Sequence, residues 1–262
     1  MITLSSDFGS PYPAAMKGVI LGETDARLVD VSHEFPRQDV RTAAFWLREV
    51  LPYFPPAVHL VVVDPGVGTD RAALAVRAGE HALVGPDNGV LAPAARALAE
   101  RDGDAPDGAT EIEGFEVEYD DPASATFHGR DVFAPAAAAV HEAGVDAIDE
   151  RDGFAPTDEW VDLSFPHPAV RADGADGEVL VVDGFGNAIT NIPGDVLDGH
   201  WGESIRINGE GAPVARAYAA VDAGQRLVTV GSHGNVELAV NRGRGDGAFG
   251  VGVGDAVTLE SA

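Results

Sequence analysis

Four short segments place polar side chains where apolar, strand-like runs end or where a helix begins. Ligands of open α/β sheets collect at the carboxyl ends of the strands, so these segments are the first candidates for a site. They comprise residues 6–9, 64–71 and 127–131, together with a group formed by residues 183–191 and 232–237.

The first two segments each contain an aspartate directly after an apolar run. Asp7 follows Ile2–Ser5, where its carboxylate can accept two hydrogen bonds from a ribose diol or cap the next helix. Asp64 follows Val58–Val63 and precedes a loop with two glycines, which let backbone approach a ligand closely. Neither a Gly-Lys-Ser/Thr sequence nor a third glycine follows, so this is no phosphate loop or dinucleotide fingerprint. Asp64 and Arg71 can pair across the loop, in a site or as a structural salt bridge.

The remaining segments contain histidine, amide and aromatic side chains. His128 lies between Phe127 and a glycine just before a predicted helix, where it either faces a pocket or is a buried structural residue. The group from residues 183–191 and 232–237 fits an adenine ring and a zwitterionic amino acid, but such residues also occur in hairpin turns. It comprises Asp183, Phe185, Asn187, Asn191, Ser232, His233, Asn235 and Glu237. The eight histidines are scattered without metal-ligand spacing, so we expect no metal site.

The composition excludes several classes of protein. The 262 residues include 17 Lys+Arg and 43 Asp+Glu, a net charge of −26 that disfavours binding to nucleic acid or anionic membranes. Lys17 is the only lysine, and this acidic, lysine-poor composition is typical of salt-adapted proteins. Without cysteine the chain has no disulfides or thiol nucleophile. Because we find neither a membrane-spanning stretch nor a signal peptide, we expect a cytoplasmic protein.

The elements that position these residues change in type along the chain. Strand-like and helix-like segments alternate up to about residue 165, which predicts an open, mostly parallel α/β sheet. Residues 102–121 hold nine acids and no base, and we expect a solvated loop and an edge hairpin there. After a Pro/Gly/Asp-rich linker, short strands predict an all-β barrel or sandwich, one of them at Val214–Ala219. The predicted divisions are 1–165, a linker at 166–177, and 178–262.

Taken together, the segments resemble one family, the S-adenosyl-L-methionine hydroxide adenosyltransferases, which are related to the fluorinase and chlorinase. The resemblance covers nearly the whole chain, with seven motifs in the family's order. They are Ser6-Asp7-Phe8-Gly9, Met16-Lys17-Gly18, Val63-Asp64-Pro65-Gly66-Val67-Gly68, Gly85-Pro86-Asp87-Asn88-Gly89, Thr126-Phe127-His128-Gly129-Arg130-Asp131, Asp183-x-Phe185-Gly186-Asn187-x-x-Thr190-Asn191 and Ala239-Val240-Asn241.

The resemblance implies a Rossmann-like α/β domain followed by a β-barrel domain. It implies a homotrimer whose sites lie between the first domain of one subunit and the second domain of its neighbour. The implied reaction converts S-adenosyl-L-methionine and water to adenosine and L-methionine, with no cofactor. The catalytic residues match Asp64, Arg71 and His128, and the ribose-binding carboxylate matches Asp7. The other substrate-binding positions match Asp183, Phe185, Asn187, Ser232, Glu237 and Val240.

Two alternative functions remain at this point. One is transfer of a halide such as chloride to S-adenosylmethionine, which the family resemblance disfavours because the halogenating relatives lack the Asp–Arg–His set. The other is a non-catalytic protein that binds adenosine or S-adenosylmethionine. The chain departs from the family after Gly9, where a shorter loop, Ser10-Pro11-Tyr12, lacks a second acidic residue.

Overall fold

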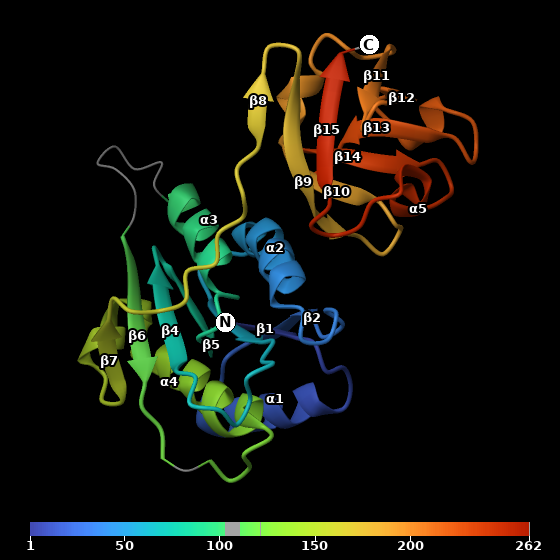
Figure 1. Ribbon diagram of the computed structural model, residues 1–262. Helices are drawn as coiled ribbons and strands as arrows, with labels where there is room; N and C mark the ends of the chain where they lie inside the picture. The colour runs from blue at the N-terminus through green and yellow to red at the C-terminus, as the bar shows by residue number, and fades with distance from the viewer. Residues whose placement is uncertain (103–110, 121, 262) are drawn as a thin grey trace. The chain divides into compact units, whose positions relative to one another are not determined.

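The computed structural model describes residues 1–102, 111–120 and 122–261. The chain divides into two compact units, Met1–Ser164 and Phe165–Ala262, each built around its own sheet (Figure 1). Residues 166–177, for which we predicted a linker, contain strand β8 and the first part of β9. In the described part of the chain, no helix is long and apolar enough to cross a membrane.

Unit 1 is a seven-stranded sheet with helices on both faces. The sheet order is β2-β1-β3-β5-β4-β6-β7. The strands are β1 (Ile2–Ser6), β2 (Leu28–Ser32), β3 (Val58–Val62), β4 (Ala73–Ala78), β5 (His81–Pro86), β6 (Ile112–Val117) and β7 (Phe154–Thr157). The helices are α1 (Tyr12–Glu23), α2 (Val40–Val50), α3 (Ala92–Asp102) and α4 (Ala134–Ala143), with short turns η1 (Leu51–Tyr53), η2 (Gly129–Phe133) and η3 (Val145–Glu150).

Only half of this sheet is parallel. The first four strands in sheet order, β2, β1, β3 and β5, are parallel, whereas β4, β6 and β7 join in antiparallel pairs. The prediction of a mostly parallel sheet was therefore wrong for the β4–β7 side. Only Gly79 and Glu80 separate β4 from β5, and so short a connection makes a hairpin rather than a parallel crossover.

The acidic stretch at residues 102–121 is only partly covered by the structure. Residues 103–110 and 121 lie outside the described residues, so the predicted loop is not tested there. The later part forms β6, which pairs with β4 on one side and β7 on the other. This strand is therefore internal to the sheet and not at its edge.

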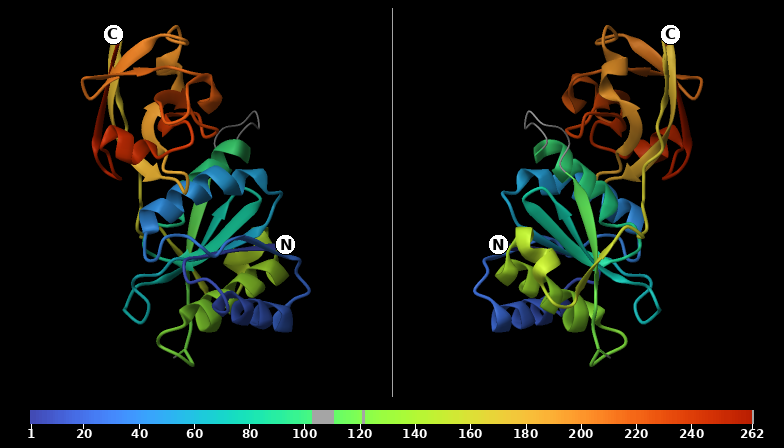
Figure 2. Two further views of the ribbon diagram at one scale, coloured as in Figure 1. Left: turned by 90° about the vertical axis from the view of Figure 1, so that its right-hand side faces the viewer. Right: turned by 90° about the vertical axis from the view of Figure 1, so that its left-hand side faces the viewer.

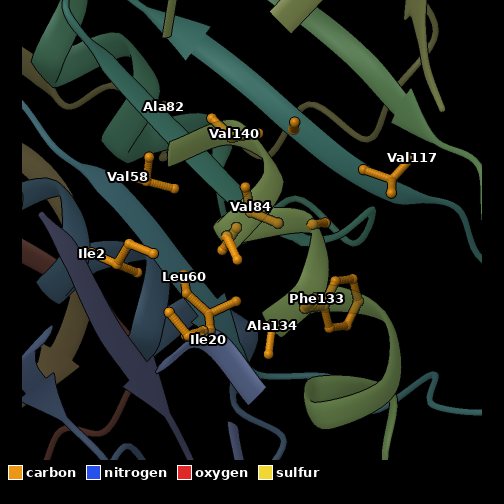
Figure 3. Packing of buried hydrophobic residues seen from close by; sticks show 14 of the residues in the cluster. Ile2, Ile20, Val58, Leu60, Ala82, Val84, Val117, Phe133, Ala134 and Val140 are labelled. Atoms are coloured by element: carbon orange, nitrogen blue, oxygen red, sulfur yellow. The ribbon is translucent and has the colours of Figure 1, made fainter. Parts of the chain in front are cut away.

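Helices cover both faces of the unit 1 sheet, and apolar side chains are buried between the sheet and the helices. Helices α1 and α4 lie on one face, and α2 and α3 lie on the other (Figure 2). Every residue of β3 is buried, as its continuous apolar run predicts. Figure 3 shows Leu60 and Val84 from the sheet gathered with Ile20 of α1 and Phe133 of η2. Asp39 is the N-cap of helix α2, and its carboxylate accepts the Thr42 N–H at 2.9 Å.

Unit 2 contains one antiparallel sheet that is nearly barrel-shaped. Its strands are β8 (Ala169–Arg171), β9 (Gly174–Val182), β10 (Ala188–Pro193), β11 (Ser204–Ile207), β12 (Glu210–Pro213), β13 (Arg226–Val230), β14 (Asn235–Val240) and β15 (Ala256–Ser261), with helix α5 (Gly245–Phe249) and turns η4 (Gly194–Leu197) and η5 (Tyr218–Ala220). The order is β12-β11-β15-β9-β10-β14-β13. Val214, directly after β12, bridges Val228 in β13, which brings the two ends of the sheet together.

One predicted strand of unit 2 is wrong, and two strands, β8 and β12, were not predicted. The stretch Val214–Ala219 forms only the bridge at Val214 and then part of the turn η5. Strand β12 instead pairs with β11 through Asn208 and Gly209, both of which have positive φ. Such an Asn-Gly pair is a strong hairpin signal, so it could have located β12.

Candidate active site

The sheet of unit 1 brings together the predicted site residues that are far apart in the sequence. Strands β1 and β3 are parallel neighbours, so Asp7 and Asp64, which follow them, lie at the same edge. Arg71 precedes β4, which runs antiparallel to β5 and therefore begins at this edge. The Asp64–Arg71 pairing that the sequence suggested is present in the structure.

His128 reaches the same edge from the segment that leads into α4. It stands directly before the π-helical turn η2. A Cβ at Gly129 would lie 2.9 Å from Sδ of Met16 and 3.2 Å from Cγ1 of Val62, so a larger residue would require these side chains of α1 and β3 to shift. A Cβ at Gly68, where φ is +79°, would lie 2.7 Å from the Ala125 carbonyl oxygen. Glycine there lets the Asp64 loop pack against the His128 segment.

Asp64, Arg71 and His128 form one hydrogen-bonded group. Nε of Arg71 donates to Oδ1 and Oδ2 of Asp64 at 3.0 and 3.1 Å, and Nη2 donates to Oδ2 as well. The same Nη2 also donates to Nδ1 of His128 at 3.0 Å. The group is largely buried, since the side chains of Arg71 and Asp64 are 9% and 6% exposed and His128 is 4% exposed. The Arg71 guanidinium lies 4.9 Å above the ring of Phe133.

The environment of His128 favours its neutral form. Burial lowers the pKa of this imidazole, the Arg71 guanidinium lowers it further, and Asp64 and Asp131 oppose the change. Because a guanidinium can only donate, Nδ1 of His128 must accept the bond from Arg71. The ring is therefore neutral with its proton on Nε2, and the Nε2–H group is its remaining donor.

Asp64 and His128 of this group line a pocket of about 500 Å³. The lining residues are Asp7, Phe8, Tyr12, Val62, Asp64, Val67, Ser124, Thr126, Phe127, His128, Gly129 and Arg130. The rings of Phe8, Tyr12 and Phe127 pack edge to face at 5.6–6.2 Å and form an aromatic wall. We predicted Tyr12 as part of the loop after Gly9 and assigned it no role in a site, whereas in the structure it is the first residue of α1.

Asp7 faces this pocket and does not cap the following helix. The N-cap of α1 is Pro11, with no side-chain capping bond, so the helix-capping alternative for Asp7 was wrong. Oδ2 of Asp7 accepts the backbone N–H of Gln38 at 2.6 Å. The carboxylate is thereby fixed through one oxygen while the residue remains part of the pocket wall.

In unit 2, Asp183, Phe185 and Asn187 lie in the turn between β9 and β10. Oδ1 of Asp183 accepts the backbone N–H groups of Phe185 and Asn187 at 2.8 and 2.9 Å, and Oδ2 accepts Nδ2 of Asn187 at 2.9 Å. Asp183 therefore organises the turn, as the hairpin alternative suggested, and the turn presents Phe185 with 82% of its surface exposed. A role for this turn in ligand binding stays a prediction.

The other predicted residues of unit 2 lie on β14 and in the turn before it. Glu237 is only 4% exposed, and its Oε1 accepts the Tyr218 hydroxyl at 2.5 Å. Its Oε2 lies 3.6 Å from Nε2 of His233. Ser232 is exposed in the β13–β14 turn, whereas Val240 is buried at the end of β14. Tyr218, which holds the Glu237 carboxylate, was missed because it fell inside a wrongly predicted strand.

Among the described residues, no three His, Asp or Glu side chains are grouped so that they could hold a metal ion. The polar groups at the pocket of unit 1 are instead tied to one another or to the backbone. They comprise a carboxylate, a guanidinium and an imidazole in direct contact with one another.

The sequence matches models of two domains of one family. Residues 2–149 match the SAM hydroxide adenosyltransferase N-terminal domain, and residues 177–258 match the C-terminal domain. The chain belongs to the SAM hydroxide adenosyltransferase family. Similar proteins named (R)-S-adenosyl-L-methionine hydrolase include one from Salinispora tropica, 41% identical over 98% of this chain and 97% of its own. Another, from Thermus thermophilus, is 41% identical over 97% of both chains.

Two solved structures are similar to this chain over nearly its full length. A crystal structure of an uncharacterized conserved protein from Thermotoga maritima has a TM-score of 0.80 and 33% identity, covering 99% of both chains. A conserved hypothetical protein from Thermus thermophilus has a TM-score of 0.75 and 36% identity, covering 98% of both chains. The fold of this family member is thus shared with its relatives over nearly its full length.

Proposed function

We propose that this protein hydrolyses S-adenosyl-L-methionine to adenosine and L-methionine by attack of water at C5′. The observation that carries the proposal is the buried Asp64–Arg71–His128 group at the wall of the unit 1 pocket. The names of the relatives, which share about two-fifths of its residues, support the same reaction.

The configuration at the sulfonium sulfur of the substrate is part of this proposal. The relatives are named for (R)-S-adenosyl-L-methionine, so we assign the same configuration at sulfur to the substrate here. Turnover of the two sulfonium epimers, followed separately by chromatography, tests the assignment. Faster loss of the (S) epimer would contradict it.

The reaction needs little covalent help from the protein, because a sulfonium is a good leaving group. The C5′–S bond breaks with its electron pair moving to sulfur, which gives the neutral thioether of methionine. A new C5′–O bond forms from water, and the water proton is released to solvent. The protein must therefore hold a water in line with the C5′–S bond and exclude bulk solvent.

The three side chains divide this task. Asp64 accepts a hydrogen bond from the attacking water and orients its lone pair toward C5′. The neutral His128 holds the same water through Nε2–H. Arg71 does not touch the water, but its guanidinium fixes both Asp64 and His128. Asp7, held through Oδ2 by the Gln38 N–H, binds the ribose hydroxyls through Oδ1.

The groups of unit 2 would complete the site. Phe185 offers an exposed aromatic face, Asn187 and Ser232 offer polar groups, and Asp183 fixes the turn that carries two of them. These residues suit the adenine ring and the methionine portion. Glu237 would act through Tyr218, whose hydroxyl it binds.

The proposal also covers the fold type of each unit and the assembly of the subunits. We assign a Rossmann-like fold to unit 1, a β-barrel to unit 2, and a homotrimer in which each site combines unit 1 of one copy with unit 2 of the next. Light scattering tests the trimer. Mixing an Asp64→Ala variant with a Phe185→Ala variant tests the shared site, because mixed trimers would regain sites with both residues intact. A lack of recovery after subunit exchange would contradict it.

Product analysis tests the reaction itself. Hydrolysis yields adenosine and methionine in equal amounts, and in heavy-oxygen water the label enters the adenosine 5′-hydroxyl. A variant with Asp64, Arg71 and His128 all replaced by alanine should lose both products. Tight binding of adenosine without turnover would instead identify a binding protein.

Halide transfer is not favoured, because the Asp64 carboxylate lines the pocket in which we place the attacking nucleophile. Its negative charge repels an anion and leaves water as the better nucleophile. We expect no chlorodeoxyadenosine even at molar chloride. Its appearance in the product chromatogram would overturn this part of the proposal.

A further inference from the structure

Four polar side chains connect the surface of unit 1 to the carboxyl end of β1. Nζ of Lys17, in α1, donates to Oδ2 of Asp30 at 2.6 Å. Oδ1 of Asp30 lies 3.0 Å from Nε2 of His33, and Nδ1 of His33 lies 2.7 Å from Oγ of Ser6. The side chains of Lys17 and Asp30 are 31% and 45% exposed, whereas that of His33 is 15% exposed and Ser6 is completely buried.

The donors in this series all point in defined directions. An ionised Asp30 can only accept, so it takes bonds from Lys17 and from Nε2–H of His33. With that proton on Nε2, Nδ1 of His33 accepts the hydroxyl proton of Ser6. Burial raises the pKa of the Asp30 carboxyl, but the hydrogen bonds from Lys17 and His33 outweigh it and hold that pKa below its usual value. Asp30 is thus a fixed anion that sets the orientation of the His33 ring.

The same residues hold the loop that carries Asp7. The backbone N–H of Gly9 donates to the His33 carbonyl at 2.9 Å, and the Phe35 N–H donates to the Ser6 carbonyl at 3.4 Å. Asp7 lies between these two connections and accepts the Gln38 N–H at 2.6 Å. Gln38 has a φ of 62°, an unfavourable backbone conformation for a residue with a side chain. The segment after β2 is therefore held in the conformation that directs an N–H group at Asp7.

We propose that Lys17, Asp30, His33 and Ser6 position the Asp7 carboxylate for the ribose hydroxyls of the substrate. This inference rests on the proposed function, in which Asp7 binds the ribose. None of the four side chains lines the pocket, so they act through Asp7 and are positioning residues. Ser6 is not a nucleophile despite its histidine neighbour, because its side chain is completely buried.

Equilibrium binding provides a test that does not depend on turnover. Adenosine carries both ribose hydroxyls and 2′,3′-dideoxyadenosine carries neither, so the ratio of their dissociation constants measures recognition of the hydroxyls. Hydrogen bonds to a charged group should make this ratio about tenfold or more in the unmodified protein. In calorimetry, Asp7→Ala should reduce the ratio of the two dissociation constants to about one. Ser6→Ala and His33→Ala should each lower this ratio at least about threefold. The same two positioning variants should raise KM and leave kcat largely unchanged.

Ser5→Ala is the matched control for Ser6→Ala. Ser5 is the preceding residue of β1, is also buried, and its hydroxyl has no hydrogen-bond partner among the described residues. The substitution removes the same atom from the same strand, and the ratio should stay at its original value. His33→Asn places an amide oxygen near the position of Nδ1 and should recover part of the ratio lost in His33→Ala. Lys17→Gln, at the exposed end, keeps the test open if Ser6→Ala fails to fold.

The outcomes separate this inference from the function on which it rests. If Asp7→Ala leaves the ratio unchanged, the ribose assignment fails and the positioning role fails with it. If Asp7→Ala reduces the ratio to about one but the Ser6, His33 and Lys17 variants have the ratio of the unmodified protein, only the positioning role is overturned. If Ser5→Ala lowers the ratio as much as Ser6→Ala, the effect comes from the strand and the hydrogen-bonded series is not its cause.

Discussion

Nη2 of Arg71 donates a hydrogen bond to Nδ1 of His128 over 3.0 Å, although 57 positions separate the two residues in the sequence. The same nitrogen binds Asp64, so one guanidinium sets the orientation of a carboxylate and an imidazole together. This contact makes Nδ1 an acceptor and leaves the imidazole proton on Nε2. A lysine at position 71 could not reproduce the arrangement, because it lacks the planar fork of donors.

Removing the Asp64 carboxylate should lower kcat for adenosine formation by about 10²-fold or more, because the attacking water loses its acceptor. Asp70→Ala is the matched control, since Asp70 is an exposed acid of the same loop. Its kcat should be close to that of the unmodified protein. An Asp64→Ala variant with nearly full activity would show that the carboxylate has no part in the reaction.

The pH dependence of kcat should reflect the neutral state of His128. Burial and Arg71 lower the pKa of this group from 6.5, so the ring stays neutral until the pH falls below that value. Protonation would put a proton on Nδ1, facing a guanidinium that can only donate. We therefore expect kcat to be constant from neutral pH down to 6.5 and to fall only below it. His128→Gln, which keeps an N–H donor but does not titrate, should remove this acid limb; an unchanged profile would assign the limb to another group.

The sequence predicted those parts of the site in which a polar residue directly follows an apolar strand and neighbouring strands run in parallel. Asp7 and Asp64 follow apolar runs, and two such strands running in parallel bring their ends together. The predicted direction of β4 was wrong. The alternation of strands and helices suggested a parallel sheet, but the two-residue connection Gly79-Glu80 makes β4 and β5 an antiparallel hairpin. The Ser6–His33 bond and the position of Tyr218 depend on tertiary packing, which leaves no periodic signal in the sequence.

The turn in unit 2 allows a separate prediction about Phe185. Asp183 accepts three hydrogen bonds within this turn, and Asp183→Ala would leave all three donors without their partner. We expect a loss of about 1–3 kcal/mol of stability and weaker substrate binding, because the turn no longer presents Phe185 in a fixed position. Phe185→Ala, an exposed position, should weaken binding with little change in unfolding temperature. If both variants bind adenosine normally, this turn is not part of the site.

Acid should destabilise unit 1 through a buried pair of histidines. Nε2 of His59 lies 2.9 Å from Nδ1 of His81, and Nδ1 of His59 lies 2.8 Å from Oγ1 of Thr3. Burial, with a smaller contribution from His81, lowers the pKa of His59 from 6.5 to about 3. Between these two values the unfolded chain binds a proton that the folded chain excludes. The free energy of unfolding should therefore fall as the pH drops below 6.5, by about 1.4 kcal/mol for each pH unit.

Urea unfolding at about pH 7.5 and about pH 5 measures this effect. His59→Gln should lower stability at both pH values but reduce the difference between them, because the residue no longer titrates. His167→Gln is the control, since His167 is exposed and its replacement should leave the difference unchanged. The buried histidines are not the cause of acid sensitivity if the unmodified protein and His59→Gln lose the same free energy between the two pH values.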